Sequence, residues 1–116
     1  HDPRGPEDKR LPFADAAPGM AGAETLLAMT LTLVRDGVID LPRAFDLLAG
    51  VPARLLGVNA GVLGEGREAD VAVIDIDKPW VVSSERMAAT AGNTPFDGQP
   101  TQGRVVALFK GGVALD

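Results

Sequence analysis

The side chains best suited to chemistry in this chain are few and widely spaced. His1 is the only histidine among 116 residues, and there is no cysteine. A zinc site takes three or four nitrogen, sulfur or carboxylate ligands that converge on one point. One imidazole among scattered carboxylates does not meet that requirement, so the sequence predicts no complete metal site within these residues.

Two acidic groupings could be read as catalytic. Glu24 and Thr25 could form an acid and its partner, but at the start of a helix they favour the positive end of the helix dipole instead. The second grouping is a spaced set of carboxylates, Asp70, Asp75 and Asp77. They alternate along a predicted strand and the turn that follows it, and this pattern predicts solvent-facing and turn-forming roles.

Composition excludes several classes of partner. The net charge is −5, and no cluster of Lys and Arg offers a surface for nucleic acid or for an anionic membrane. The longest apolar run, residues 26–34, is too short to cross a bilayer, and no signal peptide opens the chain. The absence of cysteine fits a reducing compartment, so we expect a cytoplasmic protein.

The elements that must position these residues form two unlike halves. Prolines at positions 3, 6, 12 and 18 predict a long irregular loop over residues 1–19. A helix is predicted over residues 23–34, ending at Asp36-Gly37. A second begins at the N-cap Asp40 and stops at Gly50, and a further helical turn is closed by a left-handed Gly57.

After residue 57 the pattern changes to strands. Residues 61–66 predict a short strand and turn, and residues 69–75 and 80–82 predict two β-strands. A turn-rich loop covers residues 92–103. Residues 104–110 predict a strand that meets residues 113–115 through the Gly111-Gly112 turn.

The chain opens on a loop rich in glycine, proline and charge, with nothing before His1. A folded domain seldom begins in this way, so we expect a carboxy-terminal piece of a larger protein that holds most of the chemistry.

Several short motifs stand in a characteristic order, and in that order they resemble the dihydroorotases of the amidohydrolase superfamily. Early in the chain they are His1-Asp2-Pro3-Arg4, Glu7-Asp8-Lys9, Pro12-Phe13, Pro18-Gly19 and Gly22-Ala23-Glu24-Thr25. Residues 61–66 and 69–75 are similar to the strand pair that closes many amidohydrolases. The stretch Asn93-Thr94-Pro95-Phe96-Asp97-Gly98 and the later glycines are similar to the dihydroorotase carboxy terminus.

The resemblance implies an α/β fold, namely the end of a (β/α)8 metal-dependent hydrolase barrel and strands of a small composite β-sandwich. Residues 1–57 would be the loop after barrel strand eight and the closing barrel helices, and residues 58–116 the sandwich strands. A barrel of this type takes roughly 250 residues, so this chain cannot contain one.

Dihydroorotases interconvert N-carbamoyl-L-aspartate and dihydroorotate in pyrimidine biosynthesis. The resemblance implies that zinc polarises the carbonyl and activates water while an aspartate carries the proton. That aspartate would immediately precede His1 and is absent, so no catalytic residue and no metal ligand is expected in this chain.

Four residues remain as site candidates. His1 would support the absent aspartate, or would only pack in the loop. Arg4 stands where the family has a substrate-binding histidine, and it would grip the substrate carboxylate or form a salt bridge to Glu7 or Asp8. Pro18 and Gly19 match a turn whose backbone contacts substrate in the family, or form an ordinary loop-to-helix turn.

The charged run Glu7-Asp8-Lys9 is expected to be solvated, with a lid cluster as the alternative.

We expect a homo-oligomeric enzyme, with aspartate transcarbamoylase as a possible partner. Two other functions stay open: a non-catalytic structural partner of aspartate transcarbamoylase, which the replacement of histidine by Arg4 favours, and another cyclic amidohydrolase such as a hydantoinase.

Overall fold

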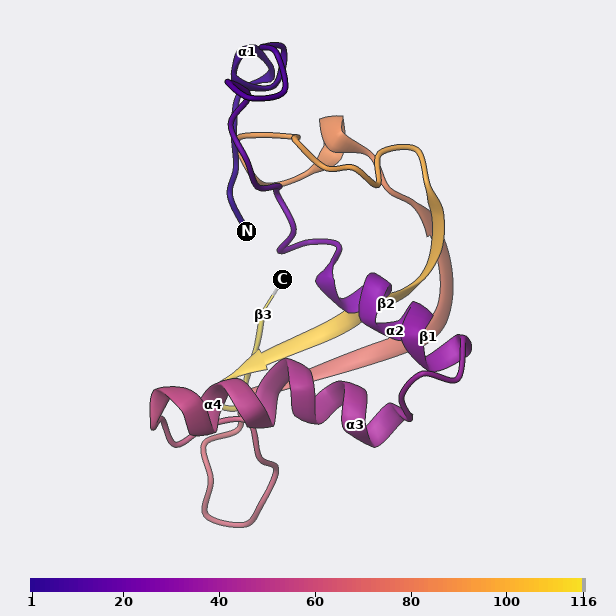
Figure 1. The fold of residues 1–116 in the computed structure, drawn as a ribbon. Helices are drawn as coiled ribbons and strands as arrows, with labels where there is room; N and C mark the ends of the chain where they lie inside the picture. Colours follow the sequence, from indigo (N-terminus) through magenta and orange to yellow (C-terminus); the bar gives the residue numbers. More distant parts are fainter. Residues whose placement is uncertain (116) are drawn as a thin grey trace. The chain divides into compact units, whose positions relative to one another are not determined.

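The computed structural model describes residues 1–115. It contains short helices in the first half and a sheet of strand order β1-β2-β3 in the second (Figure 1). The elements in chain order are α1 (Pro6–Lys9), α2 (Leu26–Arg35), α3 (Leu41–Phe45), η1 (Asp46–Gly50), α4 (Val51–Leu56), β1 (Val71–Val81), η2 (Ser84–Arg86), β2 (Pro100–Lys110) and β3 (Val113–Leu115).

The chain divides into two compact units, each made of separate stretches of sequence. The first unit combines His1–Leu26 with Pro79–Thr101, and the second combines Leu27–Lys78 with the stretch from Gln102 onward. Each unit takes residues from both sides of position 57. The division predicted from sequence, with barrel helices in residues 1–57 and sandwich strands in residues 58–116, refers to the domains of a larger protein and stays a prediction. Residue 116 lies outside the described residues.

In the second unit, α3, η1 and α4 follow one another without a break in the helical path (Figure 1). The Asp40 side chain accepts a hydrogen bond from the Arg43 N–H at 2.9 Å, which confirms the predicted N-cap. The predicted stop at Gly50 is wrong, because Gly50 has ordinary helical angles, φ −65° and ψ −49°.

A π-helical turn explains why the helix continues. The Val51 N–H bonds to the Asp46 carbonyl, five residues back, and Pro52 follows directly. A proline ring clashes with the carbonyl four residues before it in a regular α-helix, and the wider π turn relieves such a clash. A Cβ at Gly50 would lie 2.3 Å from Asp46 Oδ1, so a larger residue there would displace that carboxylate.

The helical path ends at Gly57, as predicted. Gly57 is left-handed at φ 67°, and the Val58 N–H bonds to the Ala53 carbonyl at 3.1 Å. This pattern is the Schellman C-cap.

The short strand predicted within residues 61–66 is wrong, because residues 62–64 are irregular, but the predicted turn is present at residues 65–66. Gly61 and Gly66 have φ values of 74° and 75°, which an extended strand does not accommodate. Gly61 also lies against η1, where a Cβ would be 2.7 Å from the Ala49 carbonyl oxygen.

The two strands predicted at residues 69–75 and 80–82 form one strand, β1, which runs through Pro79. A proline cannot donate to a sheet ladder, but β1 is at the edge of the sheet, where one side needs no partner. The predicted Gly111-Gly112 turn is confirmed: both glycines have positive φ, and β2 and β3 pair antiparallel with Lys110 opposite Val113.

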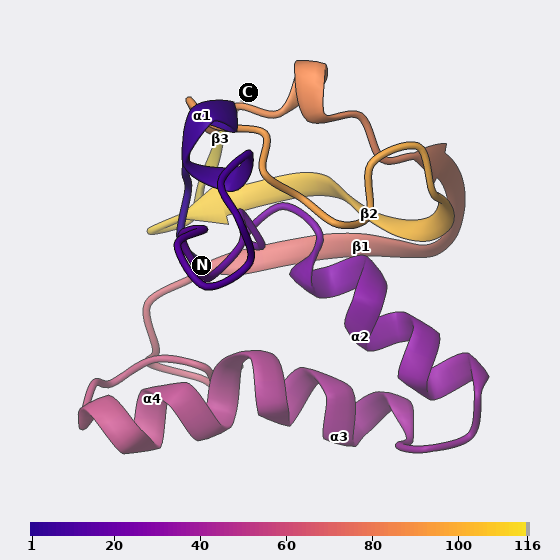
Figure 2. The same cartoon turned by 45° about the horizontal axis from the view of Figure 1, so that its top comes forward.

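Helix α2 and the sheet provide the core of the second unit. Leu31 of α2 is buried and lies against Gly103 of β2, while Arg35 Nη2 donates to the Ile76 carbonyl of β1 at 2.6 Å. Figure 2 shows α2 running beside β1. Among the helices described, none is long and apolar enough to span a bilayer.

Asp70, just before β1, connects this strand to the end of β2 and the turn that follows it. Its carboxylate accepts hydrogen bonds from Lys110 Nζ and, at 2.9 Å, from the Gly111 N–H. The Lys110 bond, aided by the Gly111 bond, holds the pKa of Asp70 below its ordinary 3.8, and the bond to Asp70 raises the pKa of Lys110 above 10.5. Asp75 and Asp77 are exposed, so the predicted solvent-facing role of these carboxylates is confirmed.

We expect Gly103→Ala to lower the free energy of unfolding by about 1–3 kcal/mol. The new Cβ would lie 2.3 Å from Leu31 Cδ1, at a φ of 104° that L-residues avoid. Gly66→Ala is the matched control, since its φ is 75° but a Cβ there meets nothing within 4 Å. Urea unfolding measures both variants, and equal losses would contradict the proposed steric contact.

We expect the Asp70–Lys110 pair to stabilise the hairpin only between its two titrations. The lowered pKa of Asp70 gives a contribution that is lost as the pH falls through that pKa. The raised pKa of Lys110 gives one that is lost as the pH rises through it. Protection of the Gly111 amide, measured as its exchange rate relative to the intrinsic rate at the same pH, should therefore fall at both extremes in the wild type and be low at all pH values in Asp70→Asn. Glu65→Gln serves as the exposed control, and wild-type protection that does not change with pH would contradict this role.

Candidate functional site

The His1 imidazole caps the turn that leads into α2. The N–H groups of Gly22 and Ala23 donate to His1 Nδ1 at 2.9 and 3.0 Å. Because Nδ1 accepts both bonds, the ring must be neutral, with its proton on Nε2. This contact is the loop packing that the sequence left open, and support of a metal-binding aspartate stays a prediction.

Arg4 forms its ion pair with a different partner from those expected. Arg4 Nε donates to Asp2 Oδ2 at 3.1 Å, instead of to Glu7 or Asp8. Residues two apart on an extended segment present their side chains to the same side, whereas Glu7 and Asp8 already belong to α1. The pair uses Nε, so both terminal guanidinium nitrogens remain able to donate to a ligand.

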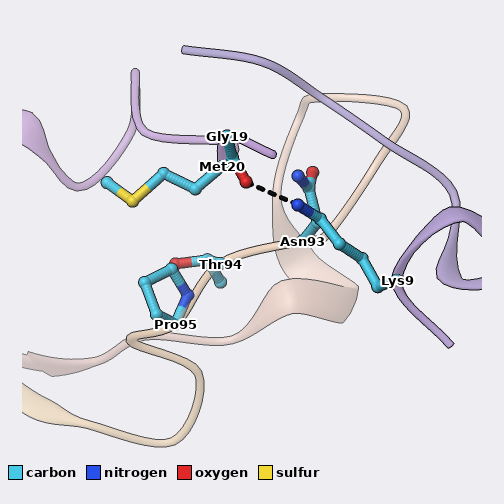
Figure 3. Close-up of a pocket in the computed structure, with 6 residues that line it drawn as sticks. All are labelled: Lys9, Gly19, Met20, Asn93, Thr94 and Pro95. Atoms are coloured by element: carbon cyan, nitrogen blue, oxygen red, sulfur yellow. Dashed lines mark hydrogen bonds between the residues drawn. The ribbon is translucent and has the colours of Figure 1, made fainter. Parts of the chain in front are cut away.

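Lys9 fastens the second half of the loop. Its Nζ donates to the carbonyl oxygens of Ala17 at 2.7 Å and Gly19 at 2.6 Å, one on each side of Pro18. Figure 3 shows the bond to Gly19. The interpretation of residues 7–9 as a solvated run is therefore wrong for Lys9, because carbonyls in an irregular loop need donors that no helix or strand supplies. The loop is also less irregular than predicted, since α1 forms one helical turn in it.

Gly19 is required by its own geometry. Its φ is 87°, and a Cβ there would lie 2.6 Å from Asp2 Cβ. The neighbouring Asp2 N–H bonds to the Met20 carbonyl at 2.6 Å. No turn is assigned at the predicted Pro18-Gly19 position, and contact of this segment with a substrate stays a prediction.

An open pocket of about 560 Å³ lies in this first unit (Figure 3). It is lined by Lys9, Gly19, Met20, Asn93, Thr94 and Pro95. Of the four candidates from sequence, only Gly19 is a lining residue. Arg4 does not line the pocket, but its backbone N–H donates to Oδ1 of the lining residue Asn93 at 2.9 Å.

Sequence reasoning did not identify Lys9 or Asn93 as site residues. The resemblance of the stretch Asn93-Thr94-Pro95-Phe96 to the dihydroorotase carboxy terminus is the sequence signal that points to Asn93. Glu24 and Thr25, considered as an acid and its partner, have structural contacts. Glu24 Oε1 accepts the Ala89 N–H at 3.1 Å, and the buried Thr25 hydroxyl donates to the Gly22 carbonyl at 3.3 Å.

The side chains of residues 1–115 do not fit a metal ion by themselves. No group of three or more His, Cys, Asp or Glu among them is arranged to hold one. The single imidazole already uses Nδ1 as an acceptor for two backbone N–H groups.

We expect Lys9→Met to lower the free energy of unfolding by about 1–3 kcal/mol, because two charge-assisted hydrogen bonds are lost while the length of the side chain is kept. Exchange of the Ala17 amide, which bonds to the Asp8 carbonyl at 2.9 Å, should accelerate. Lys78→Met, at an exposed lysine, is the control. Equal stability of the two variants would show that Lys9 does not fasten the loop.

Comparison with known proteins adds the family. No family model matches the chain. Two curated relatives are named dihydroorotase: that of Geobacter metallireducens is 38% identical over 112 residues, and that of Lactobacillus leichmannii is 40% identical over 113. Each match covers 97% of this chain and 26% of the relative, so the chain spans about a quarter of the length of these proteins.

A solved structure supports the fold. The L-hydantoinase (dihydropyrimidinase) from Arthrobacter aurescens superimposes with a TM-score of 0.79 at 32% identity, over 87% of this chain and 23% of its own. Hydantoinases are barrel proteins of the amidohydrolase superfamily, so the expected α/β fold class is confirmed. By sequence the chain belongs to the dihydroorotase family, as one segment of such a protein, and its fold is that of the amidohydrolase superfamily.

Proposed function

We propose that this chain is the part of a zinc-dependent dihydroorotase that forms the rim of its substrate site. The enzyme would interconvert N-carbamoyl-L-aspartate and dihydroorotate in de novo pyrimidine (UMP) biosynthesis. The observation that carries the proposal is the 36–40% identity to proteins named dihydroorotase over nearly the whole chain.

The geometry of the first unit supports a rim role. A charged side chain, Arg4, and a left-handed glycine, Gly19, belong to backbone segments that are hydrogen-bonded around one open pocket. Both substrates carry carboxylate groups, and a guanidinium binds a carboxylate through two parallel hydrogen bonds. A glycine backbone can approach a ligand closely. In this proposal Arg4 holds the substrate carboxylate, and the backbone of Pro18 and Gly19 contacts the ring.

Zinc, when bound, would act as a Lewis acid on the reacting carbonyl, and its ligands would lie outside this chain. What these residues contribute is orientation. The neutral His1 ring fixes the turn into α2, and the Asp2 carboxylate limits the rotation of Arg4 through the 3.1 Å contact with Nε. The cytoplasmic location, the homo-oligomer and an association with aspartate transcarbamoylase stay predictions.

A second candidate is a hydantoinase-like enzyme acting on another cyclic amide. The specific observation in its favour is the 32% identity and close superposition with the L-hydantoinase. The two candidates differ in the exocyclic carboxylate of dihydroorotate, for which Arg4 would be the partner.

We expect the full-length protein that contains this chain to turn over dihydroorotate and N-carbamoyl-L-aspartate, and to lose activity when zinc is chelated. Arg4→Ala should raise KM for dihydroorotate by at least about tenfold, because a charge-assisted pair is lost. Arg43→Ala, an arginine on α3, is the control. Turnover of a 5-substituted hydantoin but not of dihydroorotate would favour the second candidate, and inactivity on all three would favour a non-catalytic partner of aspartate transcarbamoylase.

A further inference from the structure

Asn93 makes an unusual set of contacts for an asparagine in a loop. Its Oδ1 accepts the Arg4 N–H at 2.9 Å, and its Nδ2 donates to the Asp2 carbonyl at 2.8 Å. Both bonds go to backbone groups about ninety positions away in sequence. Its own carbonyl also accepts the Ala21 N–H at 3.2 Å.

The side-chain amide of Asn93 therefore acts as a neighbouring peptide group would in a sheet. The backbone groups that it pairs with belong to Asp2 and Arg4, on either side of Pro3. Proline has no N–H, so this short segment has few backbone groups with which to form a ladder. One amide that both donates and accepts satisfies the two groups and fixes the segment.

Three segments meet at this residue. The Asp2–Arg4 segment bonds to the Asn93 side chain, Ala21 bonds to the Asn93 main chain, and the Asp2 N–H bonds to the Met20 carbonyl at 2.6 Å. Asn93 and Met20 both line the pocket. A shift of Asn93 would thus move the pocket wall and the backbone of Arg4 together.

We propose that Asn93 is a positioning residue for substrate binding. It holds the Asp2–Arg4 backbone so that the Arg4 guanidinium is placed for the substrate carboxylate, and it does so without contacting the substrate through its amide. This inference rests on the proposed function, because the role of Arg4 is defined by a carboxylate substrate.

The chemistry requires an amide of this length. An aspartate would keep the acceptor for the Arg4 N–H, but it would have no donor for the Asp2 carbonyl and would place an anion against that oxygen. An alanine loses both bonds. A glutamine retains both groups but is one methylene too long for the observed distances.

The test uses steady-state kinetics of the full-length protein with dihydroorotate, for Asn93→Ala, Asn93→Asp and Asn93→Gln. We expect KM to rise by about tenfold or more while kcat changes less, because a misplaced binding group weakens substrate affinity first. Asn59→Ala is the matched control, since Asn59 is the other asparagine of the chain and bonds only locally, to Arg67. It should keep the wild-type KM.

A double-mutant cycle separates positioning from a general loss of stability. If Asn93 acts through Arg4, then Arg4→Ala combined with Asn93→Ala should be no worse in KM than Arg4→Ala alone. Additive effects would overturn the inference. Amide exchange at Arg4, measured in Asn93→Ala, which removes the acceptor of the Arg4 N–H, should accelerate more than exchange at Val51, which lies in α4.

The outcomes also separate the inference from the proposed function. A wild-type protein that does not turn over dihydroorotate overturns the function and, with it, the role assigned to Asn93. A wild-type protein that is active, with Asn93 variants that keep a normal KM or an unchanged Arg4 amide exchange rate, overturns the inference alone.

Discussion

The described site depends on backbone groups in irregular loops finding donors and acceptors far away in sequence. Loop peptide groups lose water when they are brought together, and each unpaired group costs free energy. Lys9 satisfies the carbonyls of Ala17 and Gly19, and Asn93 satisfies Asp2 and Arg4. These two side chains replace the backbone hydrogen bonds that a sheet or helix would provide. Both line the pocket and fix the loop segments around it.

Glycines complete this arrangement where a side chain would intrude. Gly19 permits the close approach of Asp2 and Gly103 that of Leu31, each at a positive φ. In the second unit the buried residues are few and mostly small, among them Ala28, Ala44 and Ala53. Small residues let backbones approach closely, so backbone hydrogen bonds and tight glycine contacts contribute a large share of the specificity of this fold.

What could be predicted from sequence was the local part of the structure. The Asp40 cap, the Gly57 terminus and the Gly111-Gly112 turn depend on residues within a few positions of each other, and all three are confirmed. The continuation through Gly50 could not be predicted, because it depends on how a π turn accommodates Pro52. The strand expected within residues 61–66 does not form, since Gly61 and Gly66 have positive φ. For the site, Gly19 could be anticipated, and it lines the pocket. The bonds from Lys9 to two loop carbonyls could not, and neither could the pairing of Asn93, since no local pattern specifies a partner ninety residues away.

We propose that the first twenty residues and the stretch around Asn93 form the rim of a substrate site in a dihydroorotase. A structure of the full-length protein with bound dihydroorotate tests it most directly. The account predicts the substrate carboxylate within hydrogen-bond distance of the Arg4 guanidinium, and the ring beside the Gly19 backbone. A substrate bound away from residues 1–20 and 93–95, with the Arg4 guanidinium still paired only with Asp2, would contradict this proposal.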